Sequence, residues 1–170
     1  MTNRLITATE FRNQRNVSKK FDVDKINQCI DLAQSIDLYD VFNDFYFDLL
    51  ANKDTAPYAD LMSGATFTIN GETYIQVGVK SLLIDLAYAR YVYEINTNHT
   101  PFGMTQKITP DSQPIDRNMI KDLVKMAQTD ADVKFRMIDK YLRNNASTFT
   151  RYIKGDNTSI NTFSQRFSIL

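Results

Sequence analysis

A chain of 170 residues that is 43% hydrophobic and 24% charged has the composition of one globular domain, which excludes an intrinsically disordered protein. Its 20 bases balance its 20 acids, and this zero net charge argues against tight independent binding to nucleic acid. No apolar run approaches the roughly 18 residues of a membrane-spanning helix, and the amino terminus lacks the pattern of a secretory signal, so we expect no membrane contact.

Two helices are predicted in the first part of the chain. Thr7 and Glu10 have the spacing of a capping box, which indicates that a first, short helix starts there. A second helix is expected to begin after Asp22 or Asp24, to bend around residues 35–37, and then to continue with apolar residues at steps of three and four.

Asp40, Asp44 and Asp48 recur every four residues, which on one continuous helix would align three carboxylates along a single face. Such a row could collect a divalent cation or supply two carboxylates for acid–base chemistry. Like charges at this spacing also cost helix stability. A solvated or lysine-facing stripe opposite the apolar face explains the same spacing, and we favour that interpretation.

A β-hairpin is predicted near residues 66–77. Two runs typical of strands flank an Asn70-Gly71 pair, which suits the positive backbone angles of a two-residue turn. A two-stranded ribbon is only marginally stable alone. We therefore expect it to lie on the helices or to join strands from a neighbouring subunit.

The third helix is predicted from Val79 to about Asn98 and has apolar residues on nearly every side. Such a helix is either central in its domain or sandwiched between its domain and a neighbour. His99 is expected at its end, where a cationic imidazole would suit the helix dipole. The next stretch, residues 100–114, is expected to be irregular.

The fourth helix is predicted to begin after Asp116 and to reach Asn145, a length of about 45 Å at 1.5 Å per residue. One face is apolar and the other is expected to be charged. Residues 146–170 hold eight large apolar side chains, too many for a passive disordered tail. We predict an arm that orders on a partner. The alternative is a last element that folds back on the chain's own core.

No catalytic or cofactor-binding signature accompanies these elements. One Cys and one His cannot supply a zinc site, none of the five glycines belongs to a phosphate-binding loop, and no serine has the context of a nucleophile elbow. We therefore predict a protein that is not an enzyme and has no cofactor and no metal. The lone Cys29 cannot form an intrachain disulfide, so synthesis in the reducing cytosol is expected.

Four stretches, taken in order, carry a resemblance to a known family. They are Ile6-Thr7-Ala8-Thr9-Glu10-Phe11, then Ala87-Tyr88-Ala89-Arg90-Tyr91, then Phe102-Gly103-Met104-Thr105-Gln106-Lys107 with the later Ser112-Gln113-Pro114, and Lys140-Tyr141-Leu142. With this order of features the chain resembles the head–tail connector (adaptor) proteins of tailed bacteriophages. The resemblance is strongest to those of phages that infect Bacteroidota, including the neck ring proteins of crAss-like phages. It spans roughly residues 5–142 and does not cover the residues after them.

The resemblance, together with the predicted elements, implies a mainly α fold: a bundle of about four helices, two of them long, with an inserted β-hairpin and an extended carboxy-terminal arm. Residues 1–145 would form the helical connector domain, and residues 146–170 the arm. Connectors of this family form a ring, usually twelvefold, that joins the portal of the head to the tail and continues the DNA channel. The implied partners are other copies of the chain, the portal protein, downstream neck or tail proteins and, in passing, packaged DNA. The implied location is the virion neck, after assembly in the host cytoplasm.

The resemblance also suggests roles for three groups of side chains. The portal or subunit interface is assigned to apolar residues of the arm, namely Phe149, Tyr152, Ile153, Phe163, Phe167, Ile169 and Leu170. The ring interface is assigned to aromatic residues in and after the third helix, namely Tyr88, Tyr91, Tyr93 and Phe102. A DNA-channel face is assigned to bases of the fourth helix, namely Lys121, Lys125, Lys134 and Arg136.

The charge distribution fits a ring and leaves alternatives open. Residues 1–21 hold five bases against one acid, whereas residues 22–65 hold nine aspartates against two lysines. Patches of opposite charge favour end-to-end contact between copies. A solvated surface explains the same charge distribution equally well. One alternative function is a small nucleic-acid-binding module, suggested by the basic start and the bases of the fourth helix. Another is a small enzyme or regulatory subunit whose site a partner completes.

Overall fold

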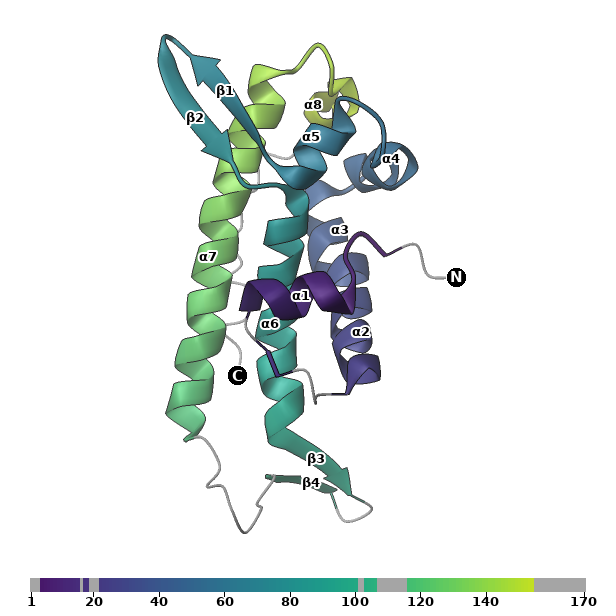
Figure 1. Cartoon of the computed structure of the whole chain (residues 1–170), viewed down its shortest axis with the longest axis vertical. Coiled ribbons are helices and arrows are strands. Elements are labelled where there is room, and N and C mark those ends of the chain that lie inside the picture. The colour runs from purple at the N-terminus through teal and green to yellow at the C-terminus, as the bar shows by residue number, and fades with distance from the viewer. Residues whose placement is uncertain (1–3, 16, 19–21, 101–102, 107–115, 155–170) are drawn as a thin grey trace.

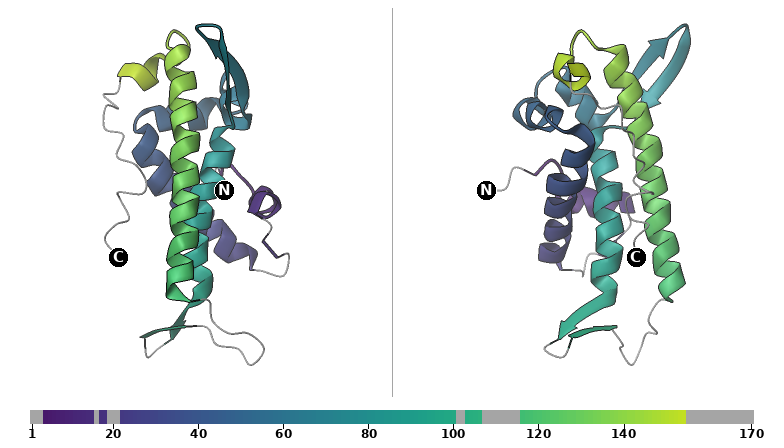
Figure 2. Two further views of the ribbon diagram at one scale, coloured as in Figure 1. Left: turned by 90° about the vertical axis from the view of Figure 1, so that its left-hand side faces the viewer. Right: turned by 180° about the vertical axis from the view of Figure 1, so that it is seen from behind.

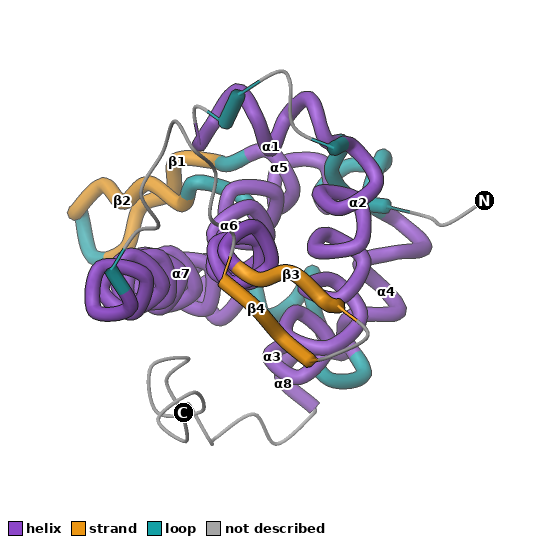
Figure 3. The backbone as a smooth tube through the Cα atoms, turned by 90° about the horizontal axis from the view of Figure 1, so that it is seen from below, coloured by secondary structure: helices purple, strands orange, loops and turns teal. Residues whose placement is uncertain are grey.

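The computed structural model describes residues 4–15, 17–18, 22–100, 103–106 and 116–154 (Figure 1). Across these residues the fold is mainly α with an inserted hairpin, as predicted. The central helix, α6 (Val79–Asn96), has α7 (Arg117–Asn144) on one side, and α2 (Val23–Leu32) and α4 (Phe45–Asn52) on the other (Figures 1 and 3).

The first two helices begin where the sequence predicts. Before α1 (Ala8–Arg15), the Thr7 amide donates a hydrogen bond to Glu10 Oε2 at 2.7 Å, and the Glu10 amide donates to Thr7 Oγ1 at 3.1 Å. The capping box is therefore confirmed. Asp22 caps α2, because its Oδ1 accepts a hydrogen bond from the Asp24 amide at 2.9 Å.

The second predicted helix is interrupted. A π-helical segment, η1 (Ala33–Leu38), follows α2 in the region of the predicted bend and leads into the short α3 (Tyr39–Phe42). Asn43 then takes a positive φ of 46°, which ends the helix before α4 starts. Because no continuous helix joins them, the row predicted on a single face is wrong for Asp40, Asp44 and Asp48.

The β-hairpin is confirmed. Strands β1 (Ala65–Ile69) and β2 (Glu72–Gln76) pair antiparallel, and the Asn70-Gly71 pair between them takes positive φ angles of 52° and 84°. The ribbon packs on α7, where the ring centroids of Phe67 and Tyr141 lie 5.3 Å apart. The chain's own helix therefore gives this ribbon a surface to lie on.

The central position predicted for the third helix is confirmed. Buried residues follow one another around α6, among them Leu82, Leu83, Ile84, Leu86, Ala87, Tyr91 and Val92. The helix ends at Asn96, slightly earlier than expected. A second hairpin follows, in which β3 (Thr97–Thr100) pairs antiparallel with β4 (Gly103–Gln106), and His99 stands on β3 rather than at the helix end. Hydrophobic periodicity does not reveal these strands, because their residues are mostly polar.

The long fourth helix is confirmed as α7, which runs antiparallel to α6 (Figure 1). Its core face consists mainly of apolar residues with a helical period: Ile120, Val124, Ala127, Ala131, Phe135, Ile138 and Leu142. The small alanines in this row let the two helices approach closely. Asp116 occupies the N-cap position, as expected, although its side chain makes no capping hydrogen bond.

The chain after α7 folds back on the core. A short helix, α8 (Thr150–Lys154), contains Tyr152 and directly follows Phe149. The two side chains are 2% and 1% exposed, respectively. The ring centroid of Phe45 lies 6.0 Å from that of Phe149 and 5.2 Å from that of Tyr152. Phe149 also lies 5.3 Å from the ring of Tyr58 in α5 (Tyr58–Ser63).

The assignment of Phe149 and Tyr152 to a partner-binding arm is therefore wrong. These two rings complete an aromatic cluster that α4 and α5 would otherwise leave open, so the core extends past the domain end predicted at residue 145. The alternative, an element that folds back on the core, holds for them. The other residues assigned to the arm lie outside the described part of the chain or have undescribed side chains: Ile153, Phe163, Phe167, Ile169 and Leu170.

Candidate interaction surfaces

A buried carboxylate ties three helices together. Asp85 on α6 has a side chain that is 0% exposed, and its two oxygens meet Arg15 Nη2 at 2.6 Å and Lys134 Nζ at 2.7 Å. Burial raises the pKa of Asp85, and the two cations oppose this shift. The prediction that Lys134 belongs to a DNA-facing row is therefore wrong, because its ammonium group is held inside by Asp85 and by Ser81 Oγ at 2.8 Å.

The tyrosines assigned to the ring interface have different environments. Tyr91 is 1% exposed and packs with its ring centroid 5.5 Å from that of Phe11, so its assignment to a surface is wrong. The sequence could not place Tyr91 correctly, because this helix has apolar residues on every side and the sequence alone does not show which side packs against the rest of the domain. Tyr88 is half-buried beneath the Arg15 guanidinium, 4.8 Å from the ring centroid. Tyr93 is exposed, and Phe102 lies outside the described residues.

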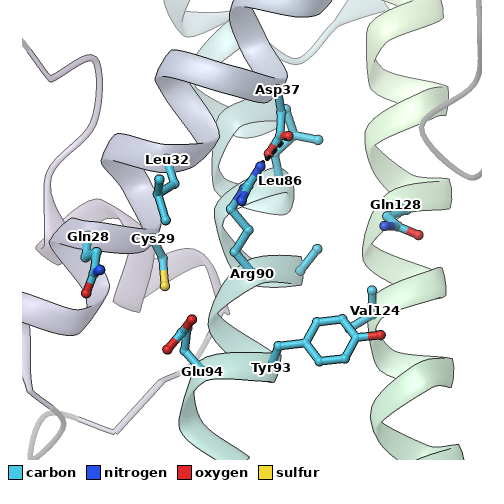
Figure 4. Close-up of a pocket in the computed structure, with 11 residues that line it drawn as sticks. Gln28, Cys29, Leu32, Asp37, Leu86, Arg90, Tyr93, Glu94, Val124 and Gln128 are labelled. Carbon is cyan, nitrogen blue, oxygen red and sulfur yellow. Dashed lines mark hydrogen bonds and ion pairs between the residues drawn. The ribbon is translucent and has the colours of Figure 1, made fainter. Parts of the chain in front are cut away.

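A pocket of about 170 Å³ lies between α2, η1, α6 and α7 (Figure 4). Its walls are largely apolar and include Leu32, Leu86 and Val124, while Tyr93 and Glu94 project from α6 (Figure 4). Sequence reasoning missed this pocket, because its residues come from α2, η1, α6 and α7, which belong to three separate parts of the chain.

Charged groups line part of the pocket but do not form a catalytic site. Arg90 holds Asp37 through two hydrogen bonds of 2.7 Å each, from Nε and Nη2, so both groups are committed to each other (Figure 4). Burial raises the pKa of the Cys29 thiol to about 11, which keeps it protonated and unreactive near neutral pH. The pocket therefore suits a small apolar side chain better than a reacting substrate.

Exposed apolar residues form a row along α7. Met119, Met126, Val133 and Met137 are all exposed, and Met126 is 52% exposed. At 3.6 residues per turn these four positions fall within about 40° of one another around the helix axis. We call this row the methionine stripe. Figure 2 (left) shows that α7 forms one side of the molecule along its whole length.

The methionine stripe corrects the prediction that the outer face of α7 is charged. The seven-residue spacing of Met119, Met126 and Val133 is visible in the sequence and could have revealed it. Lys121, Lys125 and Arg136 are nevertheless exposed, as the predicted DNA-facing row requires, but helical spacing puts them on a different side of α7 from the stripe. The exposed charges nearest the stripe are Asp122 and Asp130, four residues before and after Met126.

A second exposed apolar surface lies on η1, α3 and α4. It consists of Ile36, Tyr39 and Phe47, and we call it the aromatic patch; Phe47 is 52% exposed. The ring centroids of Tyr39 and Phe47 lie 5.8 Å apart in an edge-to-face arrangement. Asp40 and Asp44 are exposed in the same segment. Figures 1 and 3 place α4 on the far side of α6 from α7.

Among the described residues, no group of three or more His, Cys, Asp or Glu side chains is arranged to hold a metal ion. None of the helices in this part of the chain combines the length and the apolar character needed to cross a membrane.

Comparison with known proteins places the chain in a family. Neither a curated protein nor a solved structure matches it. Residues 38–162 match a profile described as a family of unknown function (DUF6712), and this match covers well over half of the sequence. The chain therefore belongs to the DUF6712 family.

Proposed function

We propose that the chain is a structural virion protein. Copies of it form a ring in the neck of a tailed phage, join the portal of the head to the tail and continue the DNA channel. The partners are other copies, in the twelvefold number usual for connectors, together with the portal and the downstream neck or tail proteins. The resemblance of residues 5–142 to head–tail connectors supports this proposal, and the mainly α fold is consistent with it.

The observation that carries the proposal is the presence of exposed apolar rows on two sides of a well-packed core. The described helices bury their own apolar faces around α6, yet the methionine stripe and the aromatic patch stay exposed. Large exposed apolar surfaces mark sites of protein association. A ring needs two different surfaces on each copy, because each subunit meets its two neighbours through different faces.

Light scattering coupled to size-exclusion chromatography tests the assembly step. The purified full chain is expected to form a closed oligomer whose mass is a multiple of the 19.6 kDa protomer. Negative-stain images of the same fraction should show rings. A protein that stays monomeric at high concentration and is absent from purified particles would contradict the proposal.

The exposed bases of α7 also suggest the alternative, a nucleic-acid-binding module. Lys121, Lys125 and Arg136 are exposed, whereas Lys134 is held by Asp85. Three phosphate contacts supply little affinity at physiological salt. We therefore keep these residues as candidates for a passing contact with packaged DNA, within the connector proposal.

A salt titration separates these two functions. The isolated chain is expected to bind duplex DNA weakly, with a slope of log K against log salt concentration no steeper than about −3, because counterion release scales with the number of neutralised phosphates. Fluorescence anisotropy with a labelled duplex measures this slope. Tight binding with a steep slope would favour the nucleic-acid-binding module.

The residues after α8 remain candidates for docking on the portal or on a neighbour. A chain that ends at Lys154 keeps Phe149 and Tyr152, so it is expected to unfold at the same temperature as the full chain but to lose incorporation into necks. Circular dichroism measures the first quantity, and complementation of a phage that lacks the gene measures the second. Normal incorporation of the shortened chain would contradict the role of Phe163, Phe167, Ile169 and Leu170.

A further inference from the structure

The pocket between α2, η1, α6 and α7 has the size and the chemistry of a site for one phenyl ring. Its volume is about 170 Å³, and a protein cavity of about 150 Å³ holds one benzene molecule. Leu86 of α6 lies between Leu32 of α2 and Val124 of α7, so the walls are mainly apolar (Figure 4). Tyr93 also lines the pocket and is exposed, so the pocket opens to the surface.

The residues after α8 can supply such a ring. Residues 160–170 include Phe163 and Phe167, four positions apart, and we call these residues the 160–170 segment. The other phenylalanines outside the described residues are Phe21, which directly precedes the cap of α2, and Phe102, which directly precedes β4. The chain ties those two rings to the ends of described elements. Eight or more residues separate Phe163 and Phe167 from α8, which gives them a longer reach.

The point from which the segment starts faces the same side of α7 as the pocket. Tyr152 of α8 donates a hydrogen bond to Asp139 Oδ1, and Gln128, which lines the pocket, lies eleven residues before Asp139. Eleven residues are about three helical turns, so Asp139 and Gln128 share one side of α7 and lie about 16 Å apart along its axis. Residues 155–159 can span up to about 17 Å. A segment that follows α8 can therefore reach a pocket on this side of the molecule.

Charges beside the pocket favour one orientation of the segment. Arg166 lies between Phe163 and Phe167 in the sequence. Glu94 projects from α6 at the pocket, whereas the other carboxylate there, that of Asp37, is already engaged by Arg90 (Figure 4). Arg166 is therefore expected to face Glu94, because opposite charges across a contact fix its register.

We infer that the 160–170 segment of one copy docks on the next copy, where Phe163 or Phe167 fills the pocket and Arg166 faces Glu94. This inference rests on the proposed function, which assigns the residues after α8 to docking. A segment held in the pocket of its own copy would join no copies. Because the segment and the pocket are two different surfaces, the contact repeats from copy to copy around a ring.

Cysteine crosslinking between coexpressed copies tests this contact in the full chain. One copy carries Tyr93→Cys at the pocket, and the other carries Phe163→Cys or Phe167→Cys. After treatment of the assembled protein with a short bismaleimide, at least one mixture is expected to give crosslinked dimers. A single chain with both substitutions is expected to give a ladder of dimers, trimers and larger species.

Matched controls set the specificity of the crosslink. Each single variant alone is expected to give no dimers, and so is a mixture in which exposed Phe47→Cys replaces Tyr93→Cys. The buried Cys29 is kept throughout, and the parent protein measures its background. Dimers from Phe47→Cys mixtures at the same yield would overturn the inference, because the segment would then have no preference for the pocket.

Two outcomes separate this inference from the proposed function. If the chain with both substitutions gives only internally crosslinked monomers, the segment lies in its own copy's pocket and the inference is overturned. An absence of crosslinks in protein that still forms rings overturns it as well, and both results leave the proposed function intact. A chain that forms no oligomer contradicts the proposed function, and the inference fails with it.

Removal of the rings gives an independent test. Phe163→Ala with Phe167→Ala is expected to weaken self-association about tenfold or more, because full burial of one phenyl ring is worth at least that much in affinity. Ser164→Ala with Ser168→Ala is the matched control and should leave association unchanged. Light scattering measures both. Unchanged association of the phenylalanine variant would overturn the inference, and so would a lower unfolding temperature of its dilute monomer, which would indicate docking within one copy.

Charge exchange tests the orientation of the segment. Glu94→Lys is expected to weaken self-association about threefold or more, because a lysine then faces Arg166. Adding Arg166→Glu to the same chain should restore association, and circular dichroism should show unchanged helix content in both variants. Failure of the combined variant to recover, with its fold intact, would overturn the pairing of Arg166 with Glu94.

Discussion

Replacing Asp85 with alanine is expected to lower the free energy of unfolding by about 3 kcal/mol, because removal of one partner leaves buried charge without compensation. Arg15 and Lys134 would lose the carboxylate that they share, and their side chains are only 17% and 22% exposed. Because both cations are partly exposed to water, the decrease in the free energy of unfolding should lie at the lower end of the range measured for broken buried ion pairs.

Urea unfolding followed by circular dichroism measures this effect, and the chain provides a matched control. Asp130 lies 3.5 Å from the same Arg15 guanidinium, but its side chain is 48% exposed. Asp130→Ala should therefore change stability by less than about 1 kcal/mol. Equal effects of the two substitutions would show that Asp85 does not hold α1, α6 and α7 together.

The second large effect is expected at Tyr152. Tyr152→Ala should cost about 3–5 kcal/mol, because it removes a buried ring from the cluster around Phe45 and leaves a cavity. Tyr152→Phe keeps the ring and removes only the hydrogen bond that the hydroxyl donates to Asp139 Oδ1 at 2.5 Å, so its cost should be about 1–2 kcal/mol.

Thermal unfolding separates a core role from an arm role for this residue. Arg151 precedes Tyr152 and pairs with Asp48 at 2.7 Å while its side chain is 53% exposed, so Arg151→Ala should have little effect on stability. If Tyr152→Ala instead kept full stability and only impaired assembly, the residue would belong to a docking arm, as the sequence first indicated.

Features governed by local chemistry could be predicted from the sequence. The capping box of Thr7 and Glu10, the cap at Asp22 and the turn at Asn70-Gly71 each depend on residues within a few positions of one another. The position of α6 followed from its apolar residues on every side, because such a helix must be covered all round. The apolar residues of α7 recur with a period of about 3.6 residues, and this periodicity identified the face of the helix that packs on the core.

Features governed by distant partners could not be predicted. Lys134 looked like one of a row of surface bases, and only the fold brings Asp85 of α6 to it. Phe149 and Tyr152 looked like an arm because the polar residues around them suggested a tail, while the cluster that receives them is built from α4 and α5. The positive φ at Asn43, which divides α3 from α4, left no clear signal in the apolar spacing.

The candidate site was predictable only in part, for the same reason. Of the four bases that the resemblance assigned to a DNA-channel face, Lys121, Lys125 and Arg136 are exposed, and Lys134 is held by Asp85. The aromatic patch depends on how η1, α3 and α4 turn relative to one another, and the pocket between α2, η1, α6 and α7 depends on packing between helices. Burial of Tyr91 and exposure of Tyr93 are likewise decided by which neighbours α6 acquires.

The most direct test of the connector role is electron microscopy of the neck in purified phage particles, at a resolution that traces helices. The connector role predicts a ring of copies of this chain around the DNA channel, between portal and tail. Particles with a complete neck that contains no copy of the chain would contradict it.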